Sequence, residues 1–206
     1  REMVTHPNIK ISYNHFFEKW FKDKSKIHIQ FLNQDKKYGF DDVIIANGPS
    51  LEQYLSGLKI SKGQLVGLKG DQPIDLDLPI NSAGYILPKV DEITWIGSTH
   101  EREFENMDIC FKAGHDLIMR TNKNFDITLA GSENMLMKAN YRVGSKDRLP
   151  LAGKIEENIY AIGGLGSRGF SFGPILGEYV ASLINNSPSP ISTGIALAID
   201  PLRFKD

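Results

Sequence analysis

A glycine-rich turn between an apolar run and an amphipathic segment constrains the fold of this chain more than any other feature. Residues 159–162 are apolar, residues 163–169 read Gly-Gly-Leu-Gly-Ser-Arg-Gly, and apolar residues then recur at helical spacing from residue 175 to residue 183. Proline is favoured in the first turn of a helix, so we expect this helix to begin at Pro174. The stretch therefore predicts a strand, a tight turn and a helix, with bare backbone amides at the positive end of the helix dipole.

The spacing of Gly164, Gly166 and Gly169 also matches the dinucleotide-binding fingerprint Gly-x-Gly-x-x-Gly. That fingerprint is meaningful only in a complete βαβ unit, with a second strand and an acidic residue about 20 positions further on. Residues 185–190 are Asn, Ser and Pro, and no second strand is expected after them, so we exclude an ADP-binding role. Two interpretations stay open: a turn that only packs a strand against a helix, or a cradle for another part of a nucleotide or flavin.

Composition and charge exclude several classes of protein. The 206 residues are 41% hydrophobic and 24% charged, which is typical of a globular protein, and the net charge of -1 provides no global basic field for nucleic acid. Cys110 is the only cysteine, which excludes an internal disulfide and is typical of a reducing compartment such as the cytoplasm. No apolar run approaches the roughly 20 residues of a membrane-spanning helix.

The N-terminal part is expected to contain a helix and a hairpin. After Ser12, a good N-cap, aromatic residues at helical spacing predict an amphipathic helix, and they are Tyr13, Phe16, Phe17, Trp20 and Phe21. Residues 26–32 alternate in polarity, which predicts a strand that turns back toward Tyr38.

The apolar run at residues 43–46 predicts a strand buried on both faces of a sheet. Ala46 and Gly48, at its carboxyl end, would allow the close approach of a ligand, although an ordinary strand-to-helix turn is slightly favoured when this stretch is taken alone. A capping box at residues 50–53 predicts that a short helix follows.

From residue 63 onward, short strand patterns follow one another with no helix between them, at residues 64–69, 83–89 and 93–99. A helix is predicted at residues 106–120, with Ile109, Ala113 and Leu117 facing inward, and another strand at residues 135–143. The order predicts an α/β fold with an antiparallel α+β insert. We expect residues 1–61 and 141–206 to form one domain and residues 62–140 to form the insert.

Two arginines are the strongest candidates for ligand contact. Arg142 ends a predicted strand, and Arg168 lies inside the glycine turn. A guanidinium beside a cofactor cradle is well shaped to hold a carboxylate through two parallel hydrogen bonds. The alternative is a surface arginine or a structural ion pair. A ligand role is favoured for Arg168, because a bulky cation inside a glycine turn has little other reason to be there, and the sequence leaves Arg142 undecided.

Other catalytic patterns have no support. His100, Cys110 and His115 do not have the spacing of zinc ligands, so no metal site is predicted. The chain contains neither a Gly-x-Ser-x-Gly elbow nor a Walker loop, which argues against a hydrolase or a phosphate-transfer enzyme.

Several of these segments resemble, in order, the landmarks of the glycine oxidase/D-amino-acid oxidase family. They are the run that ends in Ala-Asn-Gly at residues 43–48, Gly63-Gln64, Tyr141-Arg142, Asp147-x-x-Pro150-x-x-Gly153 and the turn at residues 163–169. Residues 84–88, 96–98, 148–153 and 200–204 also resemble the oxidase half of a bifunctional bacterial enzyme that modifies the wobble uridine of tRNA. The resemblance spans nearly the whole chain, weakly before Asp41 and strongly after Asp147.

The resemblance implies an FAD-dependent oxidase with a Rossmann-like FAD-binding domain and an antiparallel substrate domain. It further implies that a carboxymethylaminomethyl group on tRNA is oxidised, that glyoxylate is released, and that a fused or associated methyltransferase acts on the resulting amine. By the same resemblance, the substrate contacts are Arg142 and Arg168, and Tyr85 either lines the pocket or belongs to the core. The implied flavin contacts are Ala46, Gly48, Gly163, Gly164, Leu165, Gly166, Ser167 and Gly169.

The resemblance leaves part of the family's cofactor site unaccounted for. The amino-terminal βαβ unit of the family, which holds the ADP half of FAD, is expected before Arg1, so we expect this chain to be a fragment that binds FAD weakly or not at all and is inactive alone. Two alternatives remain. One is an amine oxidase of the same family that acts on glycine or a related amino acid without tRNA, and the other is a non-catalytic α/β module.

Overall fold

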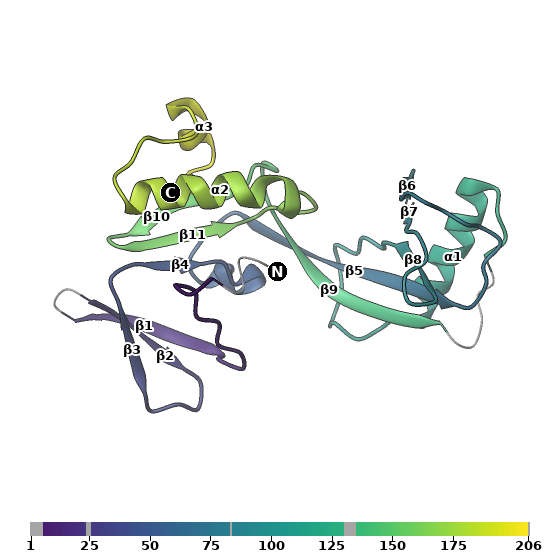
Figure 1. Ribbon diagram of the computed structural model, residues 1–206, viewed down its shortest axis with the longest axis horizontal. Coiled ribbons are helices and arrows are strands. Elements are labelled where there is room, and N and C mark those ends of the chain that lie inside the picture. Colours follow the sequence, from purple (N-terminus) through teal and green to yellow (C-terminus); the bar gives the residue numbers. More distant parts are fainter. Residues whose placement is uncertain (1–5, 24–25, 83, 130–134, 206) are drawn as a thin grey trace. The chain divides into compact units, whose positions relative to one another are not determined.

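The computed structural model describes residues 6–23, 26–82, 84–129 and 135–205, which form two compact units (Figure 1). The first unit contains the described residues up to Ala46, together with Ala152–Ile162 and Pro174–Arg203. The second contains Asn47–Leu151, Gly163–Gly173 and the chain from Phe204. The division by role, with FAD binding at residues 1–61 and 141–206 and substrate binding at residues 62–140, stays a prediction.

An antiparallel three-stranded sheet stands where a helix was expected after Ser12. Its strands are β1 (Phe17–Asp23), β2 (Lys26–Phe31) and β3 (Lys37–Phe40), in the order β1-β2-β3. The predicted helix is therefore wrong, whereas the strand at residues 26–32 and the hairpin are confirmed. Aromatic residues suit strands as well as helices, and the Phe21 ring stacks on its cross-strand partner His28 with centroids 5.4 Å apart. Pairing with β2 thus gives residues 17–23 the conformation of a strand and not of a helix.

A parallel pair of strands in the first unit confirms the α/β class. The strands β4 (Val43–Ile45), β10 (Leu151–Glu156) and β11 (Ile159–Gly163) form a sheet in the order β10-β11-β4, and β11 runs parallel to β4. Ile159 and Ala161 are fully buried, but Ile44 is 47% exposed. The prediction that the strand at residues 43–46, which is β4, is buried on both faces is therefore wrong for Ile44.

The helix after the glycine turn starts earlier than the sequence predicted. α2 (Gly169–Ile184) contains Pro174 in its interior, and α3 (Thr193–Ala198) follows it. The missing N–H of Pro174 removes only the bond to the carbonyl of Phe170, and Phe170 is fully exposed, so water can satisfy that carbonyl. The glycine turn therefore leads directly into the helix, and residues 170–173, before the predicted start at Pro174, are already helical.

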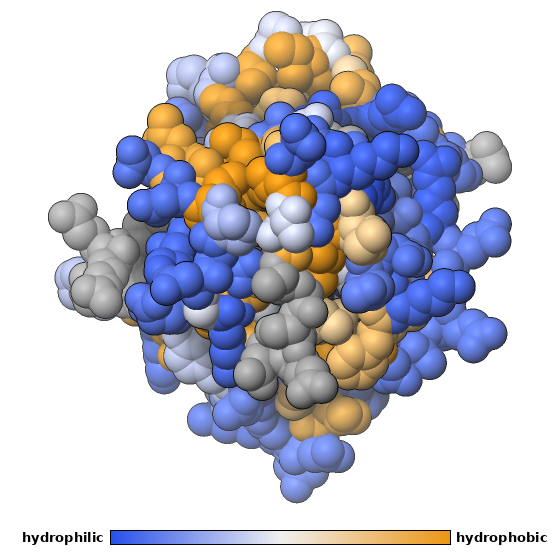
Figure 2. Space-filling view, turned by 90° about the vertical axis from the view of Figure 1, so that its right-hand side faces the viewer, coloured by the Kyte–Doolittle hydropathy of each residue, from blue (hydrophilic) through white to orange (hydrophobic). Residues whose placement is uncertain are grey.

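The second unit is built on a five-stranded antiparallel sheet, as predicted from residue 63 onward. Its order is β6-β7-β8-β5-β9. The strands are β5 (Leu58–Lys69), β6 (Ile80–Asn81), β7 (Tyr85–Ile86), β8 (Ile93–Gly97) and β9 (Leu136–Ser145). The core of the unit is a cluster of buried apolar residues, namely Val66, Leu68, Ile86, Ile96, Leu117, Ile118 and Leu129. In Figure 2, hydrophobic residues reach the surface in patches between hydrophilic ones.

Two helices of the second unit differ from their predictions. α1 (Phe111–Phe125) begins five residues later than expected, because the Asn106 side chain accepts a hydrogen bond from the Asp108 N–H and so forms a turn instead. Leu117 is buried as predicted, whereas Ile109 is exposed. The short helix predicted after β4 is present as the 3₁₀ helix η2 (Gly48–Gln53). The capping box predicted at residues 50–53 is wrong, because Ser50 lies inside this helix and the N-cap is Asn47, which makes no side-chain cap hydrogen bond.

Candidate functional site

A cavity of about 710 Å³ lies entirely within the second unit. Its walls come from segments that are far apart in the sequence: β5, the loop after β8, the end of β9 with the turn that follows, and the glycine turn. Both candidate arginines, Arg142 and Arg168, line this cavity. The fold therefore brings together the two guanidinium groups that the sequence singled out.

Strand pairing explains why the glycine turn lies beside Arg142. β5 and β9 pair antiparallel over most of their length, and Arg142 lies near the end of that ladder. An isolated bridge then joins Leu165 of the glycine turn to Gly144, and the Gly166 N–H donates to the carbonyl of Val143 over 2.8 Å. The glycine turn is thus held along the last part of β9.

Arg142 is fixed by two side chains from the loop after β8. Its guanidinium donates to Ser98 Oγ over 3.0 Å and contacts His100 Nδ1 at 3.2 Å. A guanidinium can only donate, so Nδ1 of His100 is the acceptor in this arrangement. Neither partner carries a negative charge, so the positive charge of Arg142 remains available to a bound anion.

Arg168 lies at the end of the glycine turn, immediately before α2. Its guanidinium donates to the backbone carbonyl of Arg148 and lies over the Phe172 ring, with Cζ 5.0 Å from the ring centroid. These contacts hold the side chain but do not neutralise its charge. A guanidinium has five N–H donors, so Arg168 can still bind a carboxylate.

The lining of the cavity is strongly basic. Seven of its 15 lining residues are Lys, Arg or His, and no described residue among them is Asp or Glu. The whole chain has a net charge of -1, so this basic surface is a local feature of the fold and not a consequence of composition. The cavity is therefore suited to a ligand with negative charge.

The glycines of the turn have different roles. A Cβ at Gly163 would clash with Leu51, and one at Gly164 would lie 3.3 Å from Leu151, so these two positions serve close packing. Gly166 has φ +58°, and a Cβ there would meet nothing within 4 Å. Its backbone faces open space beside the cavity, as a flat ring such as a flavin would require. The packing interpretation therefore applies to Gly163 and Gly164, whereas the cradle interpretation stays a prediction for Gly166.

Several of the predicted site residues are not part of this lining. Tyr85, Ala46 and Gly48 are not among the described residues that line the cavity. The Tyr85 ring packs against Gly97, where even a Cβ would clash with it. Burial raises the pKa of the Tyr85 hydroxyl, and the positive charge of Arg142 offsets part of that rise. Tyr85 therefore lies within the electrostatic field of the site. Gly169, the first residue of α2, has open space at its Cβ position.

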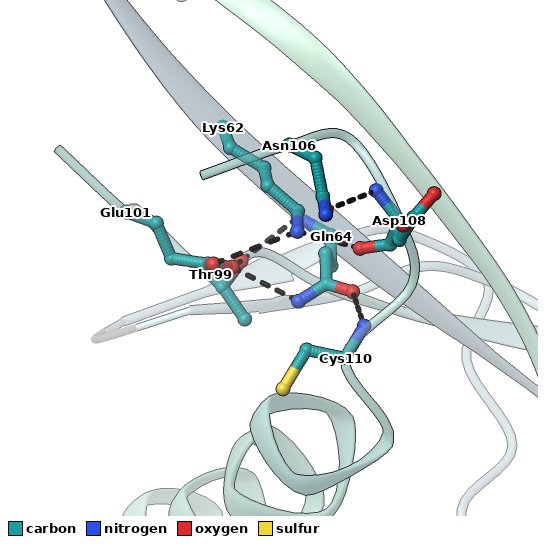
Figure 3. A network of polar contacts seen from close by, with 7 residues as sticks. All are labelled: Lys62, Gln64, Thr99, Glu101, Asn106, Asp108 and Cys110. Carbon is teal, nitrogen blue, oxygen red and sulfur yellow. Dashed lines mark hydrogen bonds and ion pairs between the residues drawn. The ribbon is translucent and has the colours of Figure 1, made fainter. Parts of the chain in front are cut away.

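A buried polar network beside the cavity was missed by the sequence reasoning (Figure 3). Gln64, which is fully buried, accepts from the Cys110 N–H over 2.7 Å and donates to Glu101 over 2.9 Å. Lys62 is 4% exposed, donates to the Asp108 carbonyl over 2.6 Å and pairs with Glu101 at 3.9 Å. The only sequence signal was a lysine and a glutamine two positions apart in the strand β5.

The network orients the loop after β8 by an alternation of side chains. Thr99 and Glu101 point toward β5, where Thr99 accepts from a backbone N–H and donates to Glu101 over 2.8 Å. The alternate residues point toward the cavity. Ser98 and His100 contact Arg142, and Arg102 lines the cavity. Successive side chains of an extended segment point to opposite sides, so anchoring one set directs the other.

In the part of the chain that the structure describes, no group of three or more His, Cys, Asp or Glu side chains is placed to hold a metal ion. The helices of that part are also all too short or too polar to cross a membrane.

Comparison with known proteins connects this site to a family. Residues 21–183 match the FAD dependent oxidoreductase family DAO. The tRNA 5-methylaminomethyl-2-thiouridine biosynthesis bifunctional protein MnmC of Campylobacter jejuni subsp. doylei is 26% identical over 228 residues, a match that covers 94% of this chain and 36% of that protein. The protein of the same name from Shewanella baltica is 21% identical over 216 residues, covering 84% and 30%. The chain thus spans about a third of the length of these relatives.

Solved structures share the fold. Glycine oxidase from Geobacillus kaustophilus superposes with a TM-score of 0.71 at 18% identity, over 91% of this chain and 51% of that one. Iminodiacetate oxidase from Chelativorans sp. gives a TM-score of 0.69 at 17% identity, over 91% and 53%. At such identities the likeness concerns the fold alone, but the family match covers most of the sequence. The chain therefore belongs to the DAO family of FAD dependent oxidoreductases.

Proposed function

We propose that this chain is the oxidase part of a tRNA-modifying enzyme. Its substrate is 5-carboxymethylaminomethyluridine, or the 2-thio form, at the wobble position of tRNA, and its product carries an aminomethyl group. The family match and the names of the curated relatives support this assignment. The observation that carries it is the meeting of Arg142 and Arg168 in one basic cavity beside the open backbone of Gly166.

The two arginines would bind the carboxylate of the substrate arm. They come from different segments, Arg142 from β9 and Arg168 from the glycine turn, so a carboxylate between them is held from two sides. Charge-assisted, bidentate contacts of this kind define both the position and the orientation of the group. Because neither arginine contacts a carboxylate of the described chain, the substrate would not have to displace one.

The reaction breaks a C–N bond and balances with one water molecule. The methylene carbon between the amine and the carboxylate loses a hydride, and the nitrogen loses a proton, which gives a C=N bond. Water adds to that carbon, the C–N bond breaks, and glyoxylate leaves while the nitrogen becomes a primary amine. When bound, FAD supplies the two-electron acceptor for this oxidation. The residues of the chain position the arm and exclude competing geometries.

The cofactor contacts on this proposal are the residues with open backbone. Gly166 and Ser167 would hold the flavin ring, because the first faces open space and both line the cavity. Gly163 and Gly164 would support that surface from behind through their packing on Leu51 and Leu151. The flavin contacts expected at Ala46, Gly48, Leu165 and Gly169 are part of the same proposal.

The product also suggests the reaction that follows. The name of the relatives refers to methylaminomethyl-thiouridine and to a bifunctional protein, and an aminomethyl group becomes methylaminomethyl by one methyl transfer. We therefore place a methyltransferase, fused or associated, after this oxidase, and both activities in the bacterial cytoplasm.

Anaerobic mixing of substrate with the FAD-loaded full protein that contains this chain tests the proposal. A tRNA that bears the carboxymethylaminomethyl arm should bleach the flavin absorbance in a single turnover and release one equivalent of glyoxylate. The same tRNA without the arm should leave the flavin oxidised, and free glycine is the comparison substrate. Bleaching by glycine at a higher kcat/KM than by the modified tRNA would contradict the proposal and favour a small-molecule amine oxidase.

A further inference from the structure

Four cations at the cavity have no task in the proposed reaction. They are Lys59, Arg102, Lys146 and Arg148, and all four are exposed and line the cavity. We propose that these phosphate-binding cations hold backbone phosphates of the RNA next to the nucleotide that carries the substrate arm. The inference rests on the proposed function and adds to it the residues that distinguish an RNA from a free amino acid.

The phosphate-binding cations are not paired with carboxylates. No salt bridge within 4.0 Å joins any of them to an acidic side chain among the residues that the structure describes. Lysines elsewhere in the chain do pair, for example Lys22 with Glu156 at 3.4 Å and Lys26 with Asp41 at 3.0 Å. Exposed cations without a salt bridge to a described carboxylate also occur elsewhere, for example Lys69, so it is the gathering of four of them around a single cavity that indicates a site for an external anion.

The acidic residues close to this cluster are engaged elsewhere. Glu101, next to Arg102 in the sequence, accepts hydrogen bonds from Gln64 and Thr99 and pairs with Lys62 in the buried network (Figure 3). Asp147, between Lys146 and Arg148, accepts from Ser145 Oγ and from the Leu149 N–H, each over 2.9 Å. Their oxygens are therefore held by the protein, and the cations beside them remain available.

The number of cations exceeds what the substrate arm needs. One carboxylate carries a single negative charge, and Arg142 and Arg168 are already sufficient to bind it. Phosphates recur along an RNA backbone with one charge each, and lysine and arginine contacts to them supply affinity and position without reading sequence. The phosphate-binding cations around a carboxylate site therefore suit a substrate whose arm is attached to RNA, and they have no use in binding free glycine.

The elements that carry these cations are held by hydrogen bonds. Lys59 lies on β5 opposite Gly144, and the Lys146 N–H donates to the Gly57 carbonyl over 2.8 Å. Arg102 follows Glu101, whose backbone N–H and carbonyl both bond to Lys62 over 2.9 Å. The side chains thus extend from backbone that is already fixed by hydrogen bonds, which lowers the conformational entropy lost when they bind a ligand.

The test is the salt dependence of RNA binding by the full protein that contains this chain. The probe is a fluorescently labelled anticodon stem-loop oligonucleotide, and its anisotropy is titrated across a series of NaCl concentrations. We expect Lys59→Gln and Lys146→Gln each to weaken binding and to reduce the slope of log Kd against log[NaCl] by about 0.7 to 0.9, the contribution of one phosphate contact. Lys69→Gln is the matched control, because Lys69 is exposed on the same strand, about 30 Å from Lys59 at the rise of a strand.

The outcomes separate this inference from the proposed function. If arm-bearing tRNA bleaches the flavin of the unsubstituted protein but Lys59→Gln and Lys146→Gln keep the slope of Lys69→Gln, the phosphate site is refuted and the oxidase function stands. If the unsubstituted protein bleaches with glycine and does not bind the stem-loop, both are refuted. A reduced slope for both variants, with the control unchanged, supports the phosphate site.

Discussion

Substituting glycines of the turn one at a time should separate packing from cofactor contact. Gly163→Ala places a methyl group against Leu51, which is fully buried, and overpacking of this kind costs about 1–3 kcal/mol. Gly166→Ala meets no atom within 4 Å but must adopt φ +58°, at a cost of about 1–2 kcal/mol. Gly166→Asn tolerates that backbone conformation better and fills the open space, so its stability should stay within about 1 kcal/mol of the parent.

Two measurements on the full protein distinguish these effects. Urea unfolding gives the loss of stability, and titration of the apoprotein with FAD, followed by flavin fluorescence, gives the affinity. We expect Gly166→Asn to weaken FAD binding more than tenfold, about 1.4 kcal/mol, while Gly163→Ala mainly lowers the urea midpoint. Gly70→Asn is the matched control, because Gly70 also has positive φ (+79°) and open space and does not line the cavity.

One result would refute the reasoning about the turn. If Gly166→Asn binds FAD as tightly as Gly70→Asn does, the backbone at Gly166 does not contact the cofactor. The glycine turn would then serve packing alone, and the cavity would need another explanation.

Three further predictions concern single side chains. Arg142→Lys and Arg168→Lys keep the charge but lose the bidentate geometry, so kcat/KM for arm-bearing tRNA should fall about 10- to 100-fold in steady-state assays. Unchanged values would show that these arginines do not bind the carboxylate of the substrate. Gln64→Met leaves its partners unsatisfied and should lower the free energy of unfolding by about 2–4 kcal/mol, against about 0.5 kcal/mol or less for the exposed Gln53→Met, as measured by urea titration. Burial raises the pKa of Tyr85, so stability from its neutral hydroxyl is complete below about pH 10 and is lost as pH rises through the folded pKa. Tyr85→Phe should abolish that loss of stability. If the free energy of unfolding falls equally with alkaline pH in both proteins, the prediction for Tyr85 is wrong.

The sequence by itself determined the features that depend on local backbone chemistry. The strand, glycine turn and helix around residues 159–184 were predicted because apolar periodicity and glycine conformations act over a few residues. The antiparallel strands after residue 63 were predicted for the same reason. Arg168 was recognised as a candidate because a large cation inside a glycine turn is anomalous without reference to the rest of the fold.

Local patterns failed where two conformations satisfied them equally. The aromatic residues after Ser12 fit a helix, but pairing of β1 with β2 made them a strand. Pro174 is favoured at a helix start, but it is also tolerated inside α2, because the carbonyl of the exposed residue Phe170 can bond to water. It therefore could not locate the beginning of α2. Asn106 closed a turn that delayed α1, although the apolar spacing allowed an earlier start.

Only the tertiary structure decided the composition of the site. Arg142, undecided from sequence, lines the cavity because β5 and β9 pair in one register and the glycine turn bridges to Gly144. His100 and Arg102 take part because the buried Lys62 and Gln64 hold the alternate residues of their loop. Such contacts join positions that are tens of residues apart, and no periodicity encodes a distance between segments. Sequence could therefore identify the turn and its arginine, whereas the fold selected the partners that surround them.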